Sequence, residues 1–274
     1  MLTVDILFSG SSGNCTLVRS EKTQILIDCG KSARAVCTAL RELGTDVSNI
    51  SAVFITHEHS DHISALSVIC KRNALAVHMT EKSAAALPDG CLFAESIVPH
   101  PQIYSETVGD LEVSSFPLPH DSAAHVGYVI ADTDGDSFGI ATDMGHVTDS
   151  AVENLSRCCR VMIEANHDIE MLREGSYPQF LKRRILSPRG HLSNEDCAGL
   201  ACVLADSGCE AIALAHLSPE NNVPSLAYSD VRCALDSAGH QNCALIVADR
   251  DHSVRFPDAG NFVFDPEDSL YAEN

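Results

Sequence analysis

Apolar residues recur along this chain with the period of an α-helix in three separate segments. In each segment they stand at positions i, i+3, i+4 and i+7, which places them on one face of a helix. The three segments are 33–40, 197–204 and 231–238. A glycine follows each within a few residues, as expected at a helix C-terminus, and Ser193 with Asp196 is typical of a capping box at the start of the second. The pattern therefore predicts three amphipathic helices.

Shorter apolar runs between these helices predict strands of two kinds. Runs that mix apolar with polar residues, as half-buried strands do, are 4–8, 111–116 and 128–131. Runs that are almost continuously apolar, as in strands buried on both faces, are 52–55, 161–163, 212–215 and 245–247. Hairpin-like strands come first and strand–helix units later. This mixture predicts an α/β fold in which helices cover the outside of sheets within one layered domain.

The composition agrees with a single globular domain. A chain of 274 residues with 45% hydrophobic residues can bury a substantial core. We expect the domain to span residues 1–264 and the acidic segment 265–274 to fray. No apolar stretch is long enough to span a membrane, and the first residues indicate a strand and a turn rather than a secretory signal.

Cysteine usage and net charge restrict the compartment and the partners. The twelve cysteines are scattered and include no CxxC pair, so we interpret them as reduced thiols of a cytoplasmic protein rather than as disulfides or a zinc finger. The formal net charge of −20 argues against broad, non-specific affinity for nucleic acid, which requires positive surface.

Three histidines and one aspartate fall within six residues, in the block HEHSDH at 57–62. His57 and His59 are two positions apart, so they point the same way in an extended segment. Asp61 and His62 follow where the next helix is expected to begin. The alternative is a solvated polar loop, but the block lies between an apolar strand and an apolar helix face. We therefore interpret it as a metal-binding motif.

Further candidate ligands stand where predicted apolar strands end. His120, Asp143 and His216 each follow such a run. Strand ends commonly carry functional residues in α/β proteins. Taken singly, the two histidines could be ordinary loop residues and Asp143 a turn former before Gly145. Their shared placement favours a role in one site.

These motifs resemble those of the metallo-β-lactamase superfamily and come in the family's order. HEHSDH at 57–62 is similar to its HxHxDH signature, and ILIDCG at 25–30 is similar to its earlier aspartate motif. The segments 115–128, 140–145 and 213–218 resemble the motifs that supply further ligands in ribonuclease Z and related proteins. The resemblance implies a four-layer αββα sandwich, with the active site in a cleft at one edge.

The resemblance also implies ligands for two divalent metal ions, which could be zinc, manganese or iron. The first ion would be held by His57, His59, His120 and Asp143. The second would be held by Asp61, His62, Asp143 and His216. Asp143 would bridge the ions, and Asp28 would support the site. Such a pair lowers the pKa of a bridging water, which then supplies hydroxide as the nucleophile.

Two more segments, EANHD at 164–168 and GHLS at 190–193, resemble the ribonuclease Z motifs that act on the leaving group. The resemblance implies that His191 protonates the departing oxygen and that Glu164 orients its imidazole, an arrangement expected of general acid catalysis. Asp61 is the remaining candidate catalytic residue. The alternative for His191 is a residue that merely precedes the helix cap at Ser193.

The whole chain resembles one subgroup in particular, the YycJ/WalJ-type metallo-hydrolases. The segments that carry this resemblance are 9–14, 164–168, 177–196 and 215–222. Members of the subgroup are described as 5′-to-3′ DNA exonucleases, so the resemblance implies a phosphodiesterase with a DNA substrate. Two alternatives remain: a small-molecule hydrolase acting on a cyclic phosphodiester, lactone or thioester, and a non-catalytic metal-binding regulatory protein. The oligomeric state, monomer or dimer, is left open.

Substrate contacts are expected near a dense basic run in this acidic chain. The run contains Lys182, Arg183, Arg184 and Arg189. It is either a clamp for the phosphate backbone or a solvated helix face. The loop at 9–14 is either a hairpin turn, which we favour, or a phosphate cradle.

The other histidines fall into two groups. His167 is interpreted as a substrate contact or as an outer partner of the site. The histidines that match no ligand motif are expected at the surface or in loops: His78, His100, His125, His146, His240 and His252.

Overall fold

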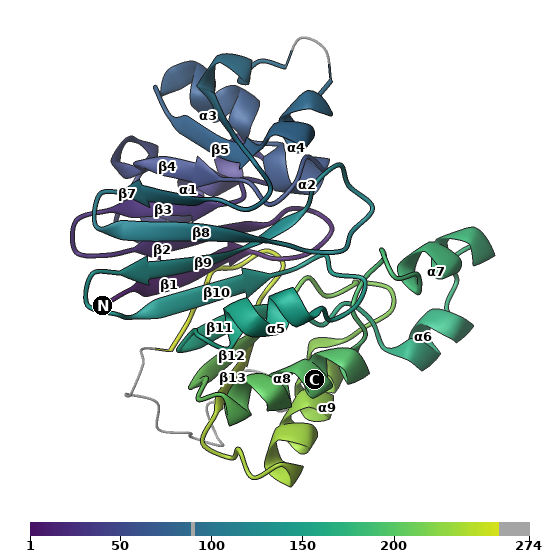
Figure 1. The fold of residues 1–274 in the computed structure, drawn as a ribbon. Coiled ribbons are helices and arrows are strands. Elements are labelled where there is room, and N and C mark those ends of the chain that lie inside the picture. The colour runs from purple at the N-terminus through teal and green to yellow at the C-terminus, as the bar shows by residue number, and fades with distance from the viewer. Residues whose placement is uncertain (89–90, 258–274) are drawn as a thin grey trace.

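Two seven-stranded sheets form the centre of the molecule (Figure 1). The computed structural model describes residues 1–88 and 91–257. The first sheet has the order β14 (Val254–Arg255), β1 (Thr3–Phe8), β2 (Cys15–Arg19), β3 (Gln24–Ile27), β4 (Ala52–Phe54), β5 (Ala76–Thr80) and β6 (Ile97–His100). The second has the order β13 (Ala244–Val247), β12 (Ala211–Ala215), β11 (Arg160–Glu164), β10 (Ser137–Ala141), β9 (Val126–Asp132), β8 (Leu111–Pro117) and β7 (Ser105–Val108).

Helices lie on the outer side of each sheet (Figure 1). Between β3 and β6 the chain forms α1 (Ala33–Glu42), α2 (Ser60–Ile63), α3 (Leu66–Arg72) and α4 (Glu81–Ala85), with short 3-10 turns at Val47–Asn49 and Ala94–Ser96. After β10 it forms α5 (Asp149–Leu155), α6 (Ile169–Glu174), α7 (Gln179–Ile185), α8 (Asn194–Asp206) and α9 (Pro224–Ser237). Among the described residues, no helix has the length and apolar content needed to cross a bilayer.

Three apolar layers hold the sandwich together. The middle layer lies between the sheets and joins residues such as Phe54 to Tyr128 and Phe138. One outer layer packs α1 and α3 on the first sheet, and the other packs α5, α8 and α9 on the second. The expected four-layer αββα sandwich is therefore confirmed, because helix, sheet, sheet and helix are separated by these three layers.

The helices and strands expected from periodicity are present. The segment 33–40 lies within α1, 197–204 within α8 and 231–238 overlaps α9. Ser193 caps α8 by accepting a hydrogen bond from the amide of Asp196 at 3.1 Å. All twelve cysteines are free thiols. The proposed tail at 265–274 lies outside the described residues.

The burial expected for the first strand is wrong. We expected β1 to be half-buried, but every residue from Val4 to Phe8 is buried. Asp5, which suggested an exposed face, is 1% exposed and accepts hydrogen bonds from Arg19 at 2.6 Å and Arg255 at 2.8 Å. A carboxylate can be buried when charged donors satisfy it, so a polar residue in a strand did not mark solvent.

Parallel strands bring the chemistry to one edge. β3, β4 and β5 run parallel in the first sheet, and β10 to β13 run parallel in the second. Parallel neighbours end at the same edge of a sheet, so their following loops are adjacent. The segments after β3 and β4 therefore face those after β10, β11 and β12.

Candidate metal centre

Residues at strand ends adopt an uncommon backbone conformation here. Asp28 follows β3, Asp143 follows β10 and His216 follows β12, with φ of 58°, 58° and 55°. Among the described residues, only Lys31 is a further non-glycine residue with positive φ. Left-handed conformations of non-glycine residues cost free energy and concentrate at functional sites. The strand ends are thus bent where side chains must turn towards one point.

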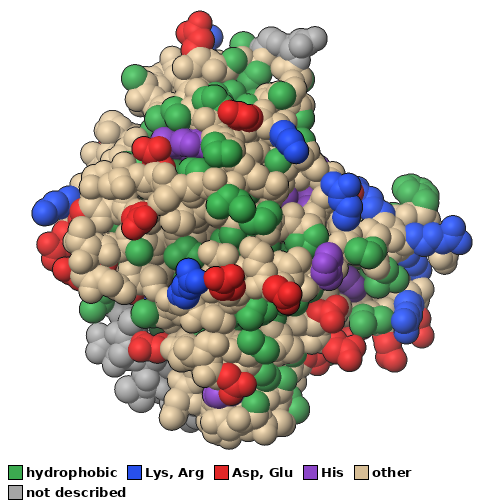
Figure 2. Space-filling view, in the orientation of Figure 1, with side chains coloured by type: hydrophobic (Ala, Val, Ile, Leu, Met, Phe, Trp, Pro, Cys, Tyr) green, Lys and Arg blue, Asp and Glu red, His purple; other side chains and the backbone are tan. Residues whose placement is uncertain are grey.

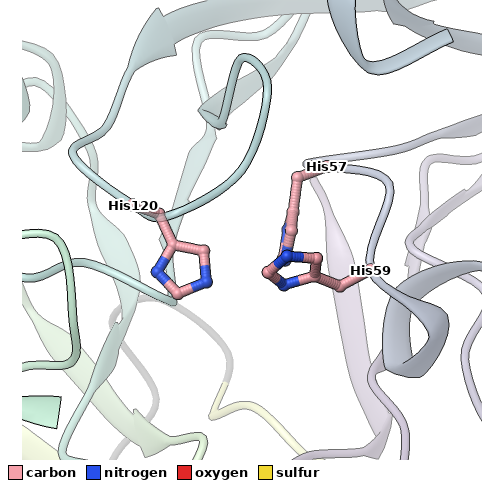
Figure 3. A group of neighbouring side chains, drawn as sticks. All are labelled: His57, His59 and His120. Atoms are coloured by element: carbon pink, nitrogen blue, oxygen red, sulfur yellow. The ribbon is translucent and has the colours of Figure 1, made fainter. Parts of the chain in front are cut away.

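Three histidines face one another in the first group, His57, His59 and His120 (Figure 3). Their ligand-type nitrogens all lie within 4.8 Å of one another. The ring centroids are 4.4 Å apart for His57 and His59 and 5.2 Å apart for either of them and His120. The rings meet at steep angles, so their in-plane lone pairs can converge on one position.

Asp143 lies beside a second group, Asp61, His62 and His216. Its Oδ2 is 3.3 Å from His62 Nε2, and its Oδ1 is 3.5 Å from His216 Nε2. Its Oδ1 is also 3.9 Å from His120 Nε2. Asp143 is therefore the carboxylate shared by both groups. These seven side chains form what we call the cleft floor.

Hydrogen bonds fix the ring orientation of the ligand histidines. His62 donates from Nδ1 to Asp28 Oδ2 at 2.8 Å, and His216 donates from Nδ1 to Glu164 Oε1 at 2.8 Å. His120 donates from Nδ1 to the carbonyl of Gly190 at 3.1 Å. Carboxylates and carbonyls only accept, so Nδ1 carries a proton in each ring and Nε2 is the nitrogen that can bind a metal, releasing any proton it holds. Metal-binding histidines are oriented by outer acceptors in this way.

The donor set fits divalent cations. Nε2 of His57, Nε2 of His216 and Oδ2 of Asp143 are buried without any hydrogen-bond partner among the described residues. Unpartnered buried polar atoms are costly, and these three point at the same space. A mixed nitrogen and oxygen set of this kind suits zinc, manganese or iron. The expected ligand residues are thus all brought together.

Charged groups on the floor shift one another's pKa values. Burial raises the pKa of Asp143, but the neighbouring His216 and His62 outweigh it and hold this pKa well below its usual value. Burial, together with His62 and His125, holds the pKa of His57 well below that of a free imidazole. A carboxylate that stays ionised and an imidazole that stays neutral are the protonation states that bind metal.

Glu164 connects the floor to His191. Its Oε1 accepts from His191 Nδ1 at 2.8 Å as well as from His216, and its Oε2 accepts from the amides of Met144 and Leu192. Burial acts to lower the pKa of His191, but the charge and hydrogen bond of Glu164 raise it above its usual value. Burial opposes ionisation of Glu164, yet His191 and further hydrogen bonds lower its pKa to about 2.

Two neighbours of the floor were missed from the sequence. The side-chain amide of Asn14 lies 3.1 Å from His62 Nε2, and Ser9 accepts from the amide of His216 at 2.8 Å. For the SGSSGN loop that carries both, the sequence favours a hairpin turn over a phosphate cradle, although the position of the loop after the first strand is a signal for a role near the site. His125, expected in a loop or at the surface, is 2% exposed, and its ring lies 4.6 Å from that of His57.

His125 is held neutral beside the first group. Its Nε2 donates to the carbonyl of Thr142 at 2.7 Å, one residue before Asp143. Burial lowers the pKa of His125 to about 3. Only its Nδ1 lacks a partner among the described residues. No ligand motif includes this histidine, so the sequence carried no signal for it beyond its position near His120.

The basic run is used largely by the protein itself. Lys182 is 7% exposed and donates to the carbonyls of Arg173 and Gly175, both at 2.7 Å. Arg189 donates to the carbonyls of His120 at 2.8 Å and Ser122 at 3.2 Å. Both residues therefore brace the loops around the site. These contacts leave Lys182 and Arg189 with less freedom to reach a phosphate than the sequence suggested.

The two central arginines of the run remain accessible. Arg184 pairs with Asp121, yet its side chain is 54% exposed and lines the cleft above the floor. Arg183 is exposed, and its side chain makes no hydrogen bond or ion pair within the described part of the chain. Of the basic run, these two can face a ligand.

His167 lies inside the protein. It is 1% exposed, and neither ring nitrogen has a hydrogen-bond partner among the described residues. Burial lowers its pKa, so the ring is neutral. A residue this buried does not touch a ligand in this conformation, which favours the outer-partner interpretation over a direct substrate contact.

His78 and His100 pair away from the cleft. His78 is 6% exposed, so the surface expectation was wrong for it, and its Nδ1 lies 2.9 Å from His100 Nε2. The two rings are nearly coplanar, with 15° between them, and Tyr104 stacks on His100. Glu106 completes a third cluster of ligand-type groups at this sandwich edge. The coplanar contact has the geometry of a hydrogen bond.

A cleft of about 240 Å³ opens above the floor. Its lining combines floor residues with Tyr177, Leu181, Arg184 and Ile185 from the α6–α7 segment. We call residues 177–185 the cleft wall. A larger hollow of about 770 Å³ lies between α6, α8 and α9, but no histidine lines it. The smaller cleft is therefore the candidate active site.

Comparison with known proteins identifies the family of this chain. Residues 23–220 match a family model described as "Beta-lactamase superfamily domain". Exodeoxyribonuclease WalJ of Streptococcus pneumoniae serotype 2 is 37% identical over 227 residues, covering 81% of this chain and 84% of that protein. Exodeoxyribonuclease YycJ of Bacillus anthracis is 36% identical over 243 residues, covering 87% and 90%.

A solved structure of low sequence identity shares the fold. The crystal structure of Zn(2+)-bound PqqB from Methylobacterium extorquens superposes with a TM-score of 0.71 at 17% identity. The match covers 93% of this chain and 99% of that chain. At this identity the likeness establishes the architecture alone.

Proposed function

Because this chain belongs to the metallo-β-lactamase superfamily, we propose that it is a metal-dependent phosphodiesterase that degrades DNA from an end, as a 5′-to-3′ exonuclease. Two relatives that cover most of the chain carry the name exodeoxyribonuclease. The polarity rests on the resemblance to the YycJ/WalJ-type subgroup. Twelve free thiols favour a cytoplasmic location.

The proposal includes two metal ions per chain, both held on the floor. His57, His59 and His120 would bind one ion, Asp61, His62 and His216 the other, and Asp143 both. When bound, such a pair activates water and stabilises the charge that develops on a phosphoryl oxygen. Asp28 and Glu164 keep the ligand rings of His62 and His216 turned towards the ions.

One observation supports a hydrolase that protonates an alkoxide leaving group, the Glu164–His191 pair, and the exodeoxyribonuclease relatives supply the phosphodiester class. His191 Nδ1 donates to Glu164 and lies 3.7 Å from Asp143 Oδ1, so Nε2 is the atom left for a ligand. The raised pKa of His191 keeps a proton available at Nε2 for the departing oxygen. An alkoxide leaving group requires this proton, whereas a site that only binds metal does not.

The test is cleavage of a 5′-phosphorylated duplex by metal-stripped protein after addition of each ion. Labels at the 5′ and 3′ ends distinguish the polarity, because release of a 5′-labelled mononucleotide as the first product indicates 5′-to-3′ degradation. Asp61→Ala is the inactive control. Turnover of a lactone or cyclic phosphodiester with no cleavage of DNA under any ion would contradict the proposal.

A further inference from the structure

The cleft wall carries apolar side chains that the protein does not cover. Phe180 on α7 is 74% exposed. Leu186, which directly follows the wall, is 47% exposed. Figure 1 shows α6 and α7 projecting from the body of the sandwich, and Figure 2 shows hydrophobic and Lys/Arg side chains together on this projection. Large exposed apolar side chains beside a cleft commonly mark a binding surface.

One face of α7 lines the cleft, and another face is exposed to solvent. Leu181 and Ile185 are four residues apart and line the cleft, together with Tyr177 just before the helix. Phe180 is three and four residues from Arg183 and Arg184, the separation at which helical side chains are neighbours. The aromatic ring thus stands beside two guanidinium groups at the rim of the cleft.

The charge on this segment is opposite to that of the whole chain. Residues 175–189 contain four basic and no acidic side chains, while the chain has a net charge of −20. A surface that combines aromatic rings with accessible arginines is complementary to unpaired nucleotides, since bases stack on the rings and phosphates pair with the guanidinium groups. An acidic body repels duplex DNA elsewhere, which confines binding to this segment.

The wall is anchored to the floor. The amide of His191 donates to the carbonyl of Ile185 at 3.0 Å, and Gly190 accepts from the ligand candidate His120. A Cβ on Gly190 would lie 2.0 Å from the carbonyl oxygen of Ile185, so the chain is pressed against the end of α7. A base held on α7 would therefore be held at a fixed distance from the floor.

We propose that Tyr177 and Phe180 form a nucleobase-stacking site for the unpaired end of a DNA strand, with Arg183 and Arg184 on its phosphates. This inference rests on the proposed function and adds the form of the substrate. The enzyme would engage single-stranded or frayed ends. Tyr177 stacks the base in the cleft, and Phe180 stacks its neighbour at the rim.

Binding is measured with a metal-loaded protein and a short phosphorothioate oligonucleotide that resists cleavage and carries 2-aminopurine near its 5′ end. Stacking quenches the fluorescence of this base. We expect Phe180→Ala to weaken binding about tenfold and to reduce the quenching, as for the loss of one stacked base, while Phe180→Trp retains both. Ile103→Ala, at a side chain that is 70% exposed, is the matched control.

The kinetic readout separates this inference from the proposed function. In Phe180→Ala, the ratio of kcat/KM for an overhanging DNA end to kcat/KM for a small aryl phosphodiester should fall about tenfold. Unchanged oligonucleotide binding and an unchanged ratio would overturn the stacking site and leave the exonuclease proposal intact. Loss of self-association in Phe180→Ala, with DNA binding unaffected, would also overturn it and identify the patch as a dimer contact. Binding without any cleavage of DNA would overturn only the proposed function.

Discussion

The cleft floor is made mostly of buried side chains, with only His59 and Asp61 partly exposed, whereas the cleft wall exposes much of its surface. His57 and His62 on the floor are 0% exposed, while Phe180 on the wall is 74% exposed. On the floor, ligand-type atoms of His57, Asp143 and His216 have no hydrogen-bond partner among the described residues and can bind a cation. On the wall, each side chain already has either solvent or a protein partner.

This difference predicts how each region responds to change. A buried group that lacks its partner costs much free energy, so removal of one floor residue affects all the others through the shared cation. An exposed contact contributes little by itself, so changes on the wall act on substrate affinity and in small steps. On our proposals, the floor determines whether the reaction occurs, and the wall determines which molecule is bound.

The largest effect is expected at the carboxylate that both ligand groups share. Asp143→Asn removes the negative charge from the centre of the floor, so both ions should bind poorly. We expect kcat/KM to fall by more than about 10⁴-fold, beyond the loss of a general acid. Metal content measured by mass spectrometry should fall with it. Asp134→Asn, at a carboxylate that is 82% exposed, is the control, and retention of two ions by Asp143→Asn would break the contrast between floor and wall.

His191 should separate chemistry from metal binding. Its replacement in His191→Ala removes the proton donor but no ligand, so kcat should fall by about 10²- to 10⁴-fold with metal content near normal. His252→Ala, at a side chain that is 86% exposed, serves as the control. An equal loss of metal would mean that His191 belongs to the floor as a ligand.

Two outer carboxylates sharpen the same distinction. Asp28→Asn and Glu164→Gln each replace the charged acceptor of a ligand histidine with a neutral amide, so each should weaken metal affinity by about 10- to 100-fold. Of these two carboxylates, only Glu164 raises the pKa of His191. The protonated acid is present below that pKa and lost above it, so Glu164→Gln alone should move the alkaline limb of kcat to lower pH.

Profiles recorded at saturating metal test this difference between the two variants. Under that condition the weaker metal affinity no longer limits the rate, and the remaining shift reports the proton on His191. If the alkaline limb moves equally in Asp28→Asn, the limb reflects a group on the floor instead.

The smallest effect is expected on the wall. Arg183→Gln removes one accessible charge, so binding of single-stranded DNA should weaken a few-fold and the slope of log K against log salt should change by about 0.7. Fluorescence titration over a range of salt concentrations measures both. Arg157→Gln, at an exposed arginine two residues after α5, is the control. An unchanged slope in Arg183→Gln would remove this residue from the phosphate path.

Much of the floor could be predicted because its residues follow motifs in sequence order. HEHSDH places four of the seven floor residues in one segment, and apolar runs identified the strand ends at His120, Asp143 and His216. Asn14 and His125 lie in segments that carry the resemblance, but their contacts could not be predicted, because no motif gives either residue a ligand position. Their positions against His62 and His57 depend on how separate strands pack.

The basic run gives the opposite lesson. In the sequence its four cations look alike, but their environments in the fold differ. Lys182 and Arg189 donate hydrogen bonds to backbone carbonyls, whereas Arg183 faces solvent. Hydrogen-bond acceptors come from residues that may be distant in sequence, so composition alone cannot assign them.

The sequence by itself determined the layered α/β architecture and the ligand types, since hydrophobic periodicity and motif spacing are local properties that each segment carries alone. Only the tertiary structure decided which polar atoms lack partners, that Glu164 serves both His191 and His216, and that Phe180 stands uncovered at the rim. These properties depend on distances between segments far apart in the chain, and such distances are set by the packing of the two sheets.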